Sequence, residues 1–225
     1  MRLRVATYNI HDGVGRDRCY DPVRIVNILR EINADVLALQ EVTLDHAGEL
    51  KQHFAATGMQ VTDGTVFEHR KGRYGNLLLT RQPVIATCIH DLSYHGREPR
   101  NAVELELDNG GKPFGLLATH LGLGQRERSA QIERLTGIVS ARDSIHLLLG
   151  DLNVWSGQSL RPLVASGFVF KAVRSFPTWP GALVALDRIL VRKPVIIHRC
   201  FRYESLLARV ASDHFPLVAE LAFEM

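Results

Sequence analysis

Short hydrophobic runs, each bounded by glycine, proline, aspartate or asparagine, recur along the chain and predict about ten β-strands. The predicted strands are Leu3–Ile10, Val36–Gln40, Leu77–Thr80, Val84–Ile89, Val103–Leu107, Phe114–Leu121, Ile145–Leu149, Leu186–Val191, Val195–Ile197 and Leu217–Phe223. Between them, Pro22–Ile32 has helical periodicity, with Asp21 as its N-cap and proline at the first helical position. Arg126–Arg142 repeats this pattern, while Asp45–Thr57 and Gly157–Ala165 show it more weakly. These helices must cover sheets from the outside.

The two halves of the chain resemble each other. Leu78–Ile85 (LLTRQPVI) and Ile189–Ile196 (ILVRKPVI) are identical at five of eight positions and lie 111 residues apart. Any two β-rich segments share valine and leucine, but three further residue pairs recur at nearly the same spacing, which favours two related halves. Two such halves predict a four-layer α/β/β/α sandwich of two mixed β-sheets flanked by helices. No linker separates the halves, so we expect one domain over residues 1–225.

The composition is that of a soluble globular protein, with 46% hydrophobic and 23% charged residues among 225. A chain of this length buries roughly 70–75% of its unfolded surface, so its core needs no disulfide or structural metal. Hydrophobic runs such as Ala182–Leu186 fall far short of the ~20 residues that span a bilayer, which excludes a transmembrane protein. The N-terminal segment MRLRVATYNIHDG reaches polar residues too early for a secretory signal. We therefore expect a cytoplasmic protein.

Net charge and cysteine content narrow the classes of partner. The formal charge of +3 permits an anionic substrate, but it is well below what holding nucleic acid by charge alone requires. Cys19, Cys88 and Cys200 are widely separated, odd in number and without CxxC spacing, which indicates neither a disulfide framework nor a zinc knuckle. We interpret them as buried or incidental thiols. No targeting tail, basic arm or heptad pattern indicates a protein partner.

Polar residues interrupt or end several predicted strands, where loops of a layered α/β protein bring distant groups together. They are Asn9, Glu41, His120, Asp151, Asn153, Asp187, Asp213 and His214. Taken singly, the amides and acids could each cap a turn or a helix. Taken together, the oxygen ligands match a hard divalent cation such as Mg²⁺ or Mn²⁺ and suit zinc poorly. His214 adjoins Asp213 and has a second acid, Asp187, available in the preceding strand.

Seven segments occur in an order that resembles a known family. They are TYNIHDG, LALQEV, GN before LLLTR, ATHL, GDLN, LDRIL and SDHFPL. In this order they resemble the endonuclease/exonuclease/phosphatase superfamily, Mg²⁺-dependent hydrolases similar to DNase I, AP endonucleases, neutral sphingomyelinases and inositol polyphosphate 5-phosphatases. The resemblance covers the whole chain. It implies a DNase I-like fold, which is the four-layer sandwich with an internal pseudo-two-fold duplication.

The resemblance implies a metal site and phosphate contacts. Glu41 resembles the principal Mg²⁺ carboxylate, with Asn9 as its amide partner and Asp213 as a further direct or water-mediated ligand. Mg²⁺ commonly keeps several waters and takes only one or two carboxylates, which agrees with a site built mainly on one glutamate. Arg100 lies where relatives place an arginine on the phosphate, and Asn76 lies where many keep a polar contact.

The resemblance also implies the catalytic groups. Asp151 and Asn153 resemble the pair that orients the attacking water and the phosphate oxygens, and His120 resembles the histidine that stabilises the phosphorane. His214 resembles the catalytic histidine, oriented by Asp187. An imidazole held by a carboxylate has a fixed tautomer and orientation, as general acid–base catalysis requires. Whether His214 or Asp151 takes the proton from water stays open, as do the number of metal ions and the choice between monoester and diester.

The loops of the expected active side carry nine cations in glycine-rich segments, which suit a phosphate-rich ligand or are solvated surface charges. They are Arg16, Arg18, Arg70, Lys71, Arg73, Arg97, Arg100, Arg126 and Arg128. Trp155, Phe176 and Trp179 could line an apolar entrance, with core packing of two of the three as the alternative. The leading hypothesis is a phosphodiesterase acting on a small or lipid-linked diester. The expected partner is a phosphoester substrate, for which a phospholipid head group and nucleic acid are both candidates. The alternatives are a structure- or damage-specific DNA nuclease and an inactive binding module.

Overall fold

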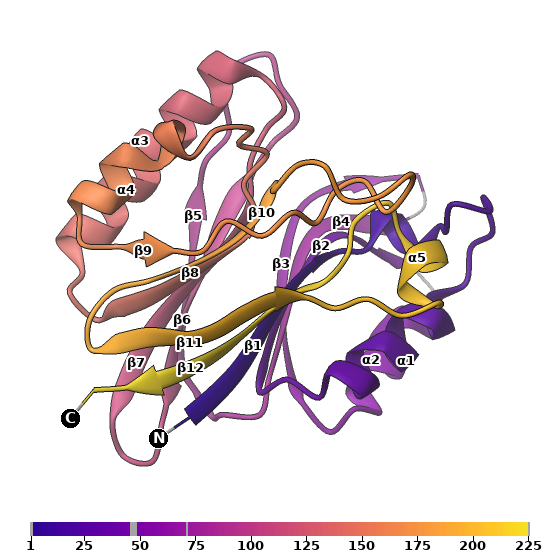
Figure 1. Ribbon diagram of the computed structural model, residues 1–225, viewed down its shortest axis with the longest axis horizontal. Helices are drawn as coiled ribbons and strands as arrows, with labels where there is room; N and C mark the ends of the chain where they lie inside the picture. Colours follow the sequence, from indigo (N-terminus) through magenta and orange to yellow (C-terminus); the bar gives the residue numbers. More distant parts are fainter. Residues whose placement is uncertain (1, 46–48, 71, 225) are drawn as a thin grey trace.

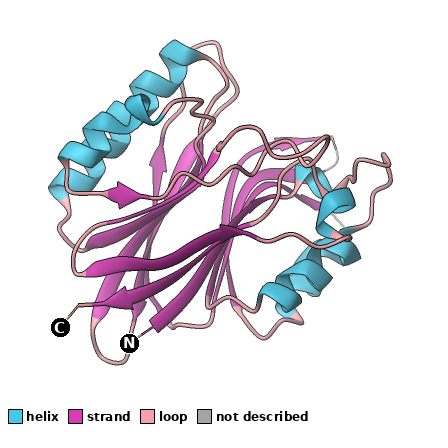
Figure 2. Ribbon diagram, in the orientation of Figure 1, coloured by secondary structure: helices cyan, strands magenta, loops and turns pink. Residues whose placement is uncertain are grey.

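The computed structural model describes residues 2–45, 49–70 and 72–224. Two six-stranded mixed sheets pack face to face, and helices cover the outer face of each (Figures 1 and 2). The predicted four-layer sandwich is therefore confirmed. Hydrophobic side chains fill all three interfaces between the layers. The middle interface, between the sheets, receives residues such as Val5, Val36, Leu105 and Leu149.

The first sheet combines strands from both ends of the chain, in the order β11-β12-β1-β2-β4-β3. Its strands are β1 (Arg2–Asn9), β2 (Val36–Asp45), β3 (Gln60–His69), β4 (Gly72–Thr80), β11 (Val195–Arg202) and β12 (Leu217–Phe223). The second sheet has the order β5-β6-β7-β8-β10-β9. Its strands are β5 (Val84–Asp91), β6 (Asn101–Asp108), β7 (Pro113–His120), β8 (Ile145–Asp151), β9 (Val169–Phe170) and β10 (Asp187–Val191).

The two sheets share one topology, which confirms the predicted duplication. In the first sheet β1 and β2 run parallel, and β4 pairs antiparallel with β2 and then with β3. In the second sheet β7 and β8 run parallel, and β10 pairs antiparallel with β8 and then with β9. The similar sequence segments therefore run from equivalent strands, β4 and β10, through the turns that follow them to the first residues of β5 and β11.

Helices connect many of the strands and cover the outer faces of the two sheets. They are α1 (Pro22–Ile32), α2 (Glu49–Ala55), α3 (Gln125–Ala141), α4 (Arg161–Ala165) and α5 (Ala208–Ala211), with 3₁₀ turns η1 (His11–Gly13) and η2 (Gly157–Leu160). The predicted cap is present, since the Asp21 side chain accepts a hydrogen bond from the Arg24 amide at the start of α1. Among the helices in the described part of the chain, none combines the length and apolarity needed to cross a membrane.

The structure corrects several predicted elements. β2 runs on to Asp45, and the predicted helix Asp45–Thr57 is helical only at Glu49–Ala55, with residues 46–48 outside the described part. The predicted helix Gly157–Ala165 is a 3₁₀ turn followed by the short α4. β3 and β9 were not predicted, because β3 is half-exposed along most of its length and β9 has only two residues.

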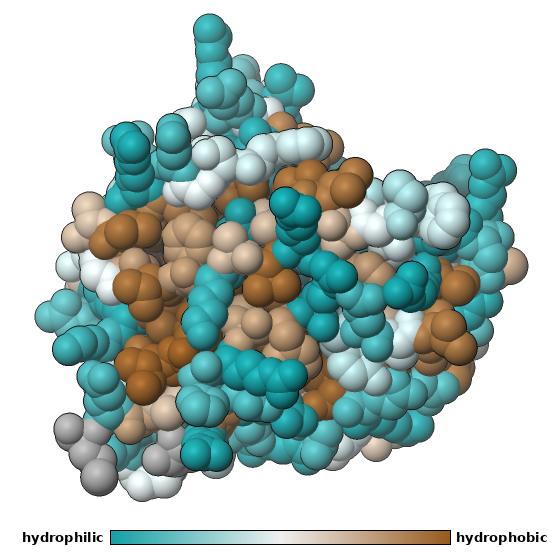
Figure 3. Space-filling view, viewed as in Figure 1, coloured by the Kyte–Doolittle hydropathy of each residue, from teal (hydrophilic) through white to brown (hydrophobic). Residues whose placement is uncertain are grey.

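On the face seen in Figure 3, hydrophobic side chains gather over β9 and β11.

Candidate active site

The register of the second sheet brings three predicted residues together at one end. His120, the last residue of β7, pairs with Asp151, the last residue of β8. Asp187, the first residue of β10, pairs with Asp151 from the other side. Because neighbouring strands lie about 4.8 Å apart, this register places Asp151 between the histidine and the second aspartate.

Gly150 makes the close approach of β7 and β8 sterically feasible at this point. Its φ of +150° is one that side-chain-bearing residues rarely adopt. A Cβ atom at this position would lie 1.8 Å from the carbonyl oxygen of Thr119. The glycine of the GDLN segment therefore allows the chain to set Asp151 directly against the end of β7.

The first sheet supplies Asn9 and Glu41 from neighbouring strands. Asn9 ends β1 and pairs with Gln40 of the parallel β2. The pairing of β2 with β4 is interrupted between Leu39 and Val42 by a β-bulge, and Glu41 has a left-handed backbone with φ of 53°. Bulges re-aim side chains and are common beside active sites. Here the bulge brings the Glu41 carboxylate beside the amide of Asn9.

Asn9 links the two sheets through hydrogen bonds. Its Nδ2 donates to Glu41 Oε1 at 2.8 Å and to Asp151 Oδ2 at 3.1 Å. Its Oδ1 accepts from the backbone N–H of His11 at 3.1 Å. In this arrangement Asn9 holds two carboxylates from different sheets at a fixed separation.

These groups face a cavity of about 190 Å³. It is lined by Asn9, Glu41, Arg100, His120, Leu123, Asp151, Asn153, Phe176, Leu186, Asp213 and His214. Eight of the ten predicted site residues are among them. This volume is below the roughly 300–1,000 Å³ of sites that enclose a drug-sized ligand, so the cavity suits a phosphoryl group with an ion rather than a whole nucleotide or lipid. The remainder of any larger substrate must lie outside it.

Asp187 does not line the cavity and instead supports His214. His214 Nδ1 lies 2.9 Å from Asp187 Oδ2, and the Ser175 hydroxyl donates to the same oxygen at 2.5 Å. Burial lowers the pKa of His214, but the carboxylates of Asp187, Asp151 and Asp213 outweigh it and raise this pKa to about 10. His214 is therefore an imidazolium at neutral pH, with Nε2 pointing toward Asp151 Oδ2 at 3.7 Å.

His120, in contrast to His214, is held as a neutral imidazole. A guanidinium only donates, so the 3.2 Å contact from Arg100 Nη1 makes His120 Nδ1 the acceptor. The neutral ring then carries its proton on Nε2, which lies 3.7 Å from Asp151 Oδ2 and 4.0 Å from Glu41 Oε1. Burial, together with the charges of Arg100 and His214, lowers the pKa of His120 well below its ordinary value. His120 is thus a neutral hydrogen-bond donor that points into the cavity.

Asp151 lies at the centre of the cluster. One carboxylate oxygen faces Asn9 and both histidines, and the other accepts from the backbone N–H of Asn153 at 3.0 Å. Burial and the nearby charge of Asp187 raise the pKa of Asp151 to about 6. Asn153 has a φ of 52°, and its side-chain amide donates to the carbonyl of Leu121 at 2.8 Å. A buried carboxylate with this raised pKa suits proton transfer near neutral pH.

Of the two predicted phosphate contacts, Arg100 lies at the cavity and Asn76 does not line it. Arg100 lines the cavity and pairs with Glu98 at 2.9 Å. Asn76 is not among the described residues that line it: its buried amide donates to Asn101 Oδ1 at 3.0 Å, joining β4 to β6. Its role as a substrate contact stays a prediction, and the contacts observed here are structural.

Sequence reasoning did not identify three polar residues next to the cluster. Tyr74 interacts with Arg100, and burial and the charge of Glu41 raise the pKa of its hydroxyl. Ser212 donates to the backbone carbonyl of Asn9 at 2.8 Å and accepts from the N–H of His214 at 3.2 Å. Ser175 is the donor to Asp187 described above. The sequence could have indicated two of them, since Tyr74 precedes the GN segment and Ser212 begins the SDH segment. No pattern in the sequence marks Ser175.

Apolar side chains line part of the cavity, and others are exposed on the chain segments that supply its wall. Phe176 lines the cavity with its ring 4.7 Å from that of His214, and Leu123 lines it while 76% exposed. Trp155 and Trp179 are 70% and 64% exposed, so core packing is wrong for both. The amide of Leu183, a further exposed side chain, donates to the Phe176 carbonyl at 2.8 Å. We call Leu123, Trp155, Trp179 and Leu183 the apolar rim.

Some of the predicted cations accompany this rim. The Arg16 guanidinium lies over the Trp179 ring at 5.5 Å, and Arg128 donates to the carbonyl of Leu123. Arg73 instead pairs with Asp63 at 2.7 Å, away from the residues that line the cavity. Lys71 lies outside the described residues. The rim is therefore both apolar and cationic.

The sequence of the chain matches a known protein family. The model of the Endonuclease/Exonuclease/phosphatase family matches residues 6–214. The chain is similar to the "Uncharacterized protein YbhP" of Escherichia coli strain K12, with 28% identity over 97% of this chain and 96% of that protein.

Solved structures support the fold. A mannosyl-6-phosphatase from Bacteroides thetaiotaomicron superposes with a TM-score of 0.77 and 20% identity, covering 98% of this chain and all of that one. D. rerio TDP2, in a complex with a single-strand DNA product, gives a TM-score of 0.79 and 18% identity over 98% of this chain and 99% of that one. At these identities the likeness establishes the fold alone.

Proposed function

The chain belongs to the endonuclease/exonuclease/phosphatase family, and from that premise we propose that it is a Mg²⁺- or Mn²⁺-dependent phosphodiesterase acting on a small or lipid-linked phosphodiester. The observation that carries the proposal is the convergence of Glu41, Asp151, His120 and His214 on one small cavity. Such a site holds the groups that hydrolysis of a phosphoester needs: acidic oxygens for a cation, a base, and donors to phosphate.

The donor set fits a hard divalent ion. Glu41 and Asp213 offer carboxylate oxygens on the cavity wall, and the Glu41 side chain is 25% exposed, so a hydrated ion can reach it. The ion would supply neutralisation of charge on the phosphate oxygens. Binding through the oxygen of Asn9 stays a prediction, because its contacts here favour holding Glu41 through Nδ2.

The remaining residues can act on the phosphate and the attacking water. The Asp151 carboxylate, with its raised pKa, accepts the proton of the water. His120 donates its Nε2 proton in a hydrogen bond to a phosphate oxygen, and the His214 imidazolium places positive charge beside the developing negative charge. Arg100 fixes His120 and adds a second cation to the cavity wall.

The apolar rim favours a lipid-linked diester over nucleic acid. The cavity is too small for a whole lipid, and exposed Leu123 lines it, so the apolar part of a lipid can lie on Leu123 and on the exposed side chains of the flanking segments. Exposed apolar side chains that are grouped mark interaction sites, and tryptophan favours the membrane–water interface. A DNA-hydrolysing activity is the alternative that the experiments below separate.

Hydrolysis of bis(p-nitrophenyl) phosphate tests the proposed reaction. We expect turnover with Mg²⁺ or Mn²⁺ that EDTA abolishes and added metal restores, because the carboxylates of the cavity otherwise repel the anionic phosphate. The monoester p-nitrophenyl phosphate should react more slowly than the diester. Diester turnover that resists EDTA would contradict the proposal, and metal-dependent nicking of plasmid DNA without activity on lipid would favour the nuclease.

Removal of rim side chains tests the lipid-linked substrate. In the Trp179→Ala/Leu183→Ala variant, hydrolysis of phosphatidylglycerol in mixed vesicles with phosphatidylcholine should fall about tenfold relative to hydrolysis of the soluble diester. Partial burial of these side chains in lipid contributes about 1.4 kcal/mol or more. Val169→Ala, another exposed apolar position, is the matched control and should leave the ratio unchanged. An unchanged ratio in the double variant would reject a lipid contact at the rim.

A further inference from the structure

A second cluster of metal-ligating side chains lies on the second sheet, away from the catalytic cavity. Cys88 and His90 are two residues apart in β5, so their side chains share one face of the sheet. Cys88 pairs directly with Glu104 of β6, which brings the carboxylate to the same face. One ligand atom from each of the three residues lies within 4.8 Å of the others.

The contacts of Glu104 show how the cluster is held. His90 Nε2 lies 2.7 Å from Glu104 Oε2, and Arg142 Nη1 donates to Glu104 Oε1 at 2.6 Å. The glutamate side chain is only 9% exposed, whereas that of Arg142 is 45% exposed. One carboxylate oxygen is therefore anchored by a cation from the end of α3, and the other is directed at the imidazole.

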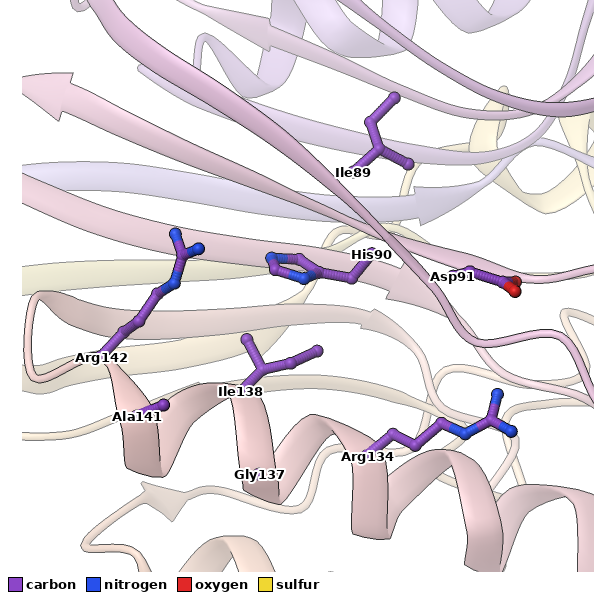
Figure 4. Close-up of a pocket in the computed structure, with 8 residues that line it drawn as sticks. All are labelled: Ile89, His90, Asp91, Arg134, Gly137, Ile138, Ala141 and Arg142. Atoms are coloured by element: carbon purple, nitrogen blue, oxygen red, sulfur yellow. The ribbon is translucent and has the colours of Figure 1, made fainter.

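The cluster also has access to solvent. His90 and Arg142 line a cavity of about 620 Å³ between β5 and α3, and Figure 4 shows both side chains reaching into this space from opposite elements. Gly137 faces the same space on α3, and a Cβ atom there would meet nothing within 4 Å. An ion and its water ligand can therefore reach the imidazole from this side.

We propose that Cys88, His90 and Glu104 form a second metal site that takes Zn²⁺. Thiolate, imidazole and carboxylate together are the ligands of zinc, which commonly has three protein ligands and a water, whereas Mg²⁺ prefers oxygen ligands alone. Binding releases the thiol proton of Cys88, and the neutral imidazole of His90 coordinates through one ring nitrogen while the other carries the hydrogen. Arg142 then orients the carboxylate from outside the ligand set, as supporting groups do in zinc sites.

The site differs from the catalytic one in its ligands and its role. None of the described residues that line the catalytic cavity is a cysteine, and the two cavities share no lining residue. β5 is the edge strand of its sheet, paired only with β6 among the strands described. A metal that joins β5 to β6 beneath α3 would stabilise this edge and leave the hydrolytic reaction to the other cavity.

Cobalt substitution tests the site in the full-length protein. Stripped protein titrated with Co²⁺ should develop a near-ultraviolet thiolate-to-cobalt charge-transfer band that saturates as the cysteine-containing site fills. The band should persist in Glu41→Gln and in Cys200→Ser, which removes another partly buried thiol, and should be absent from Cys88→Ser. No band in the folded wild-type protein, or a band that survives in Cys88→Ser, would overturn the proposal.

Alkylation provides a test that needs no variant. Bound Zn²⁺ should slow the reaction of Cys88 with iodoacetamide about tenfold or more, because a metal-bound thiolate is no longer a free nucleophile. Exposed Cys19 serves as the internal reference and should react at the same rate with and without Zn²⁺. Equal rates at Cys88 in both conditions, measured by peptide mass spectrometry, would reject the site even if Cys88→Ser fails to fold.

Discussion

The Glu41→Gln variant is expected to lose about a thousandfold or more in kcat/KM on bis(p-nitrophenyl) phosphate, which corresponds to about 4 kcal/mol of transition-state stabilisation. The substitution preserves size, and the amide oxygen of glutamine can still accept the 2.8 Å hydrogen bond from Asn9. What it removes is the negative charge that would attract a divalent ion. The loss should therefore shrink when Mg²⁺ or Mn²⁺ is raised.

Two controls separate this effect from unfolding. Glu133→Gln removes the same charge from an exposed position on α3 and should retain wild-type kcat/KM. Thermal unfolding of Glu41→Gln should occur near the wild-type temperature, because the glutamine keeps the hydrogen bond from Asn9. Activity within tenfold of wild type in a folded variant would mean that the metal lies elsewhere.

The positions of the site residues could be predicted because each ends or interrupts a hydrophobic run. Strand ends are visible in sequence: Asn9 closes VATYN and Asp151 closes LLLG, and in a layered α/β fold such ends meet. The sequence similarity between the segments that form β4 and β10 predicted a second sheet, because similar segments in two related halves form equivalent strands. These local patterns predicted the fold and the strand ends that meet at the cavity, whereas Arg100 and Asn76 were inferred from the family resemblance alone.

Other features depend on register and could not be predicted. The pairing of Cys88 with Glu104 follows from how β5 aligns with β6, which no spacing within either strand reveals. Ser175 lies 12 residues before Asp187 and reaches it only because the intervening loop folds back. The exposure of Trp155 and Trp179 is likewise tertiary, since a tryptophan has the same apolar character in a core and at a rim.

The Asp187→Asn variant is expected to lose activity in a pH-dependent way that the wild-type protein does not show. In the wild type, the carboxylates around His214 outweigh burial and raise its pKa to about 10, so the imidazolium persists through the neutral range and is lost only as pH approaches that value. Without the Asp187 charge, burial remains and the pKa of His214 falls, so the imidazolium is lost at a lower pH. Activity of the variant should then decline as pH rises across neutrality.

The contact between His214 and Asp187 also determines how large the losses of activity should be and which variants serve as controls. His214→Ala should lower kcat by about 10²–10³, the usual loss when one group that stabilises developing negative charge is removed, at every pH tested. Asp187→Asn should approach the wild-type rate at acidic pH, where its imidazole is protonated, and the His214→Ala rate at alkaline pH. His198→Ala removes an exposed histidine of β11 and should follow the wild-type profile. Identical pH profiles for Asp187→Asn and wild type would show that the 2.9 Å contact positions His214 without setting its charge, because only the electrostatic role predicts a shift.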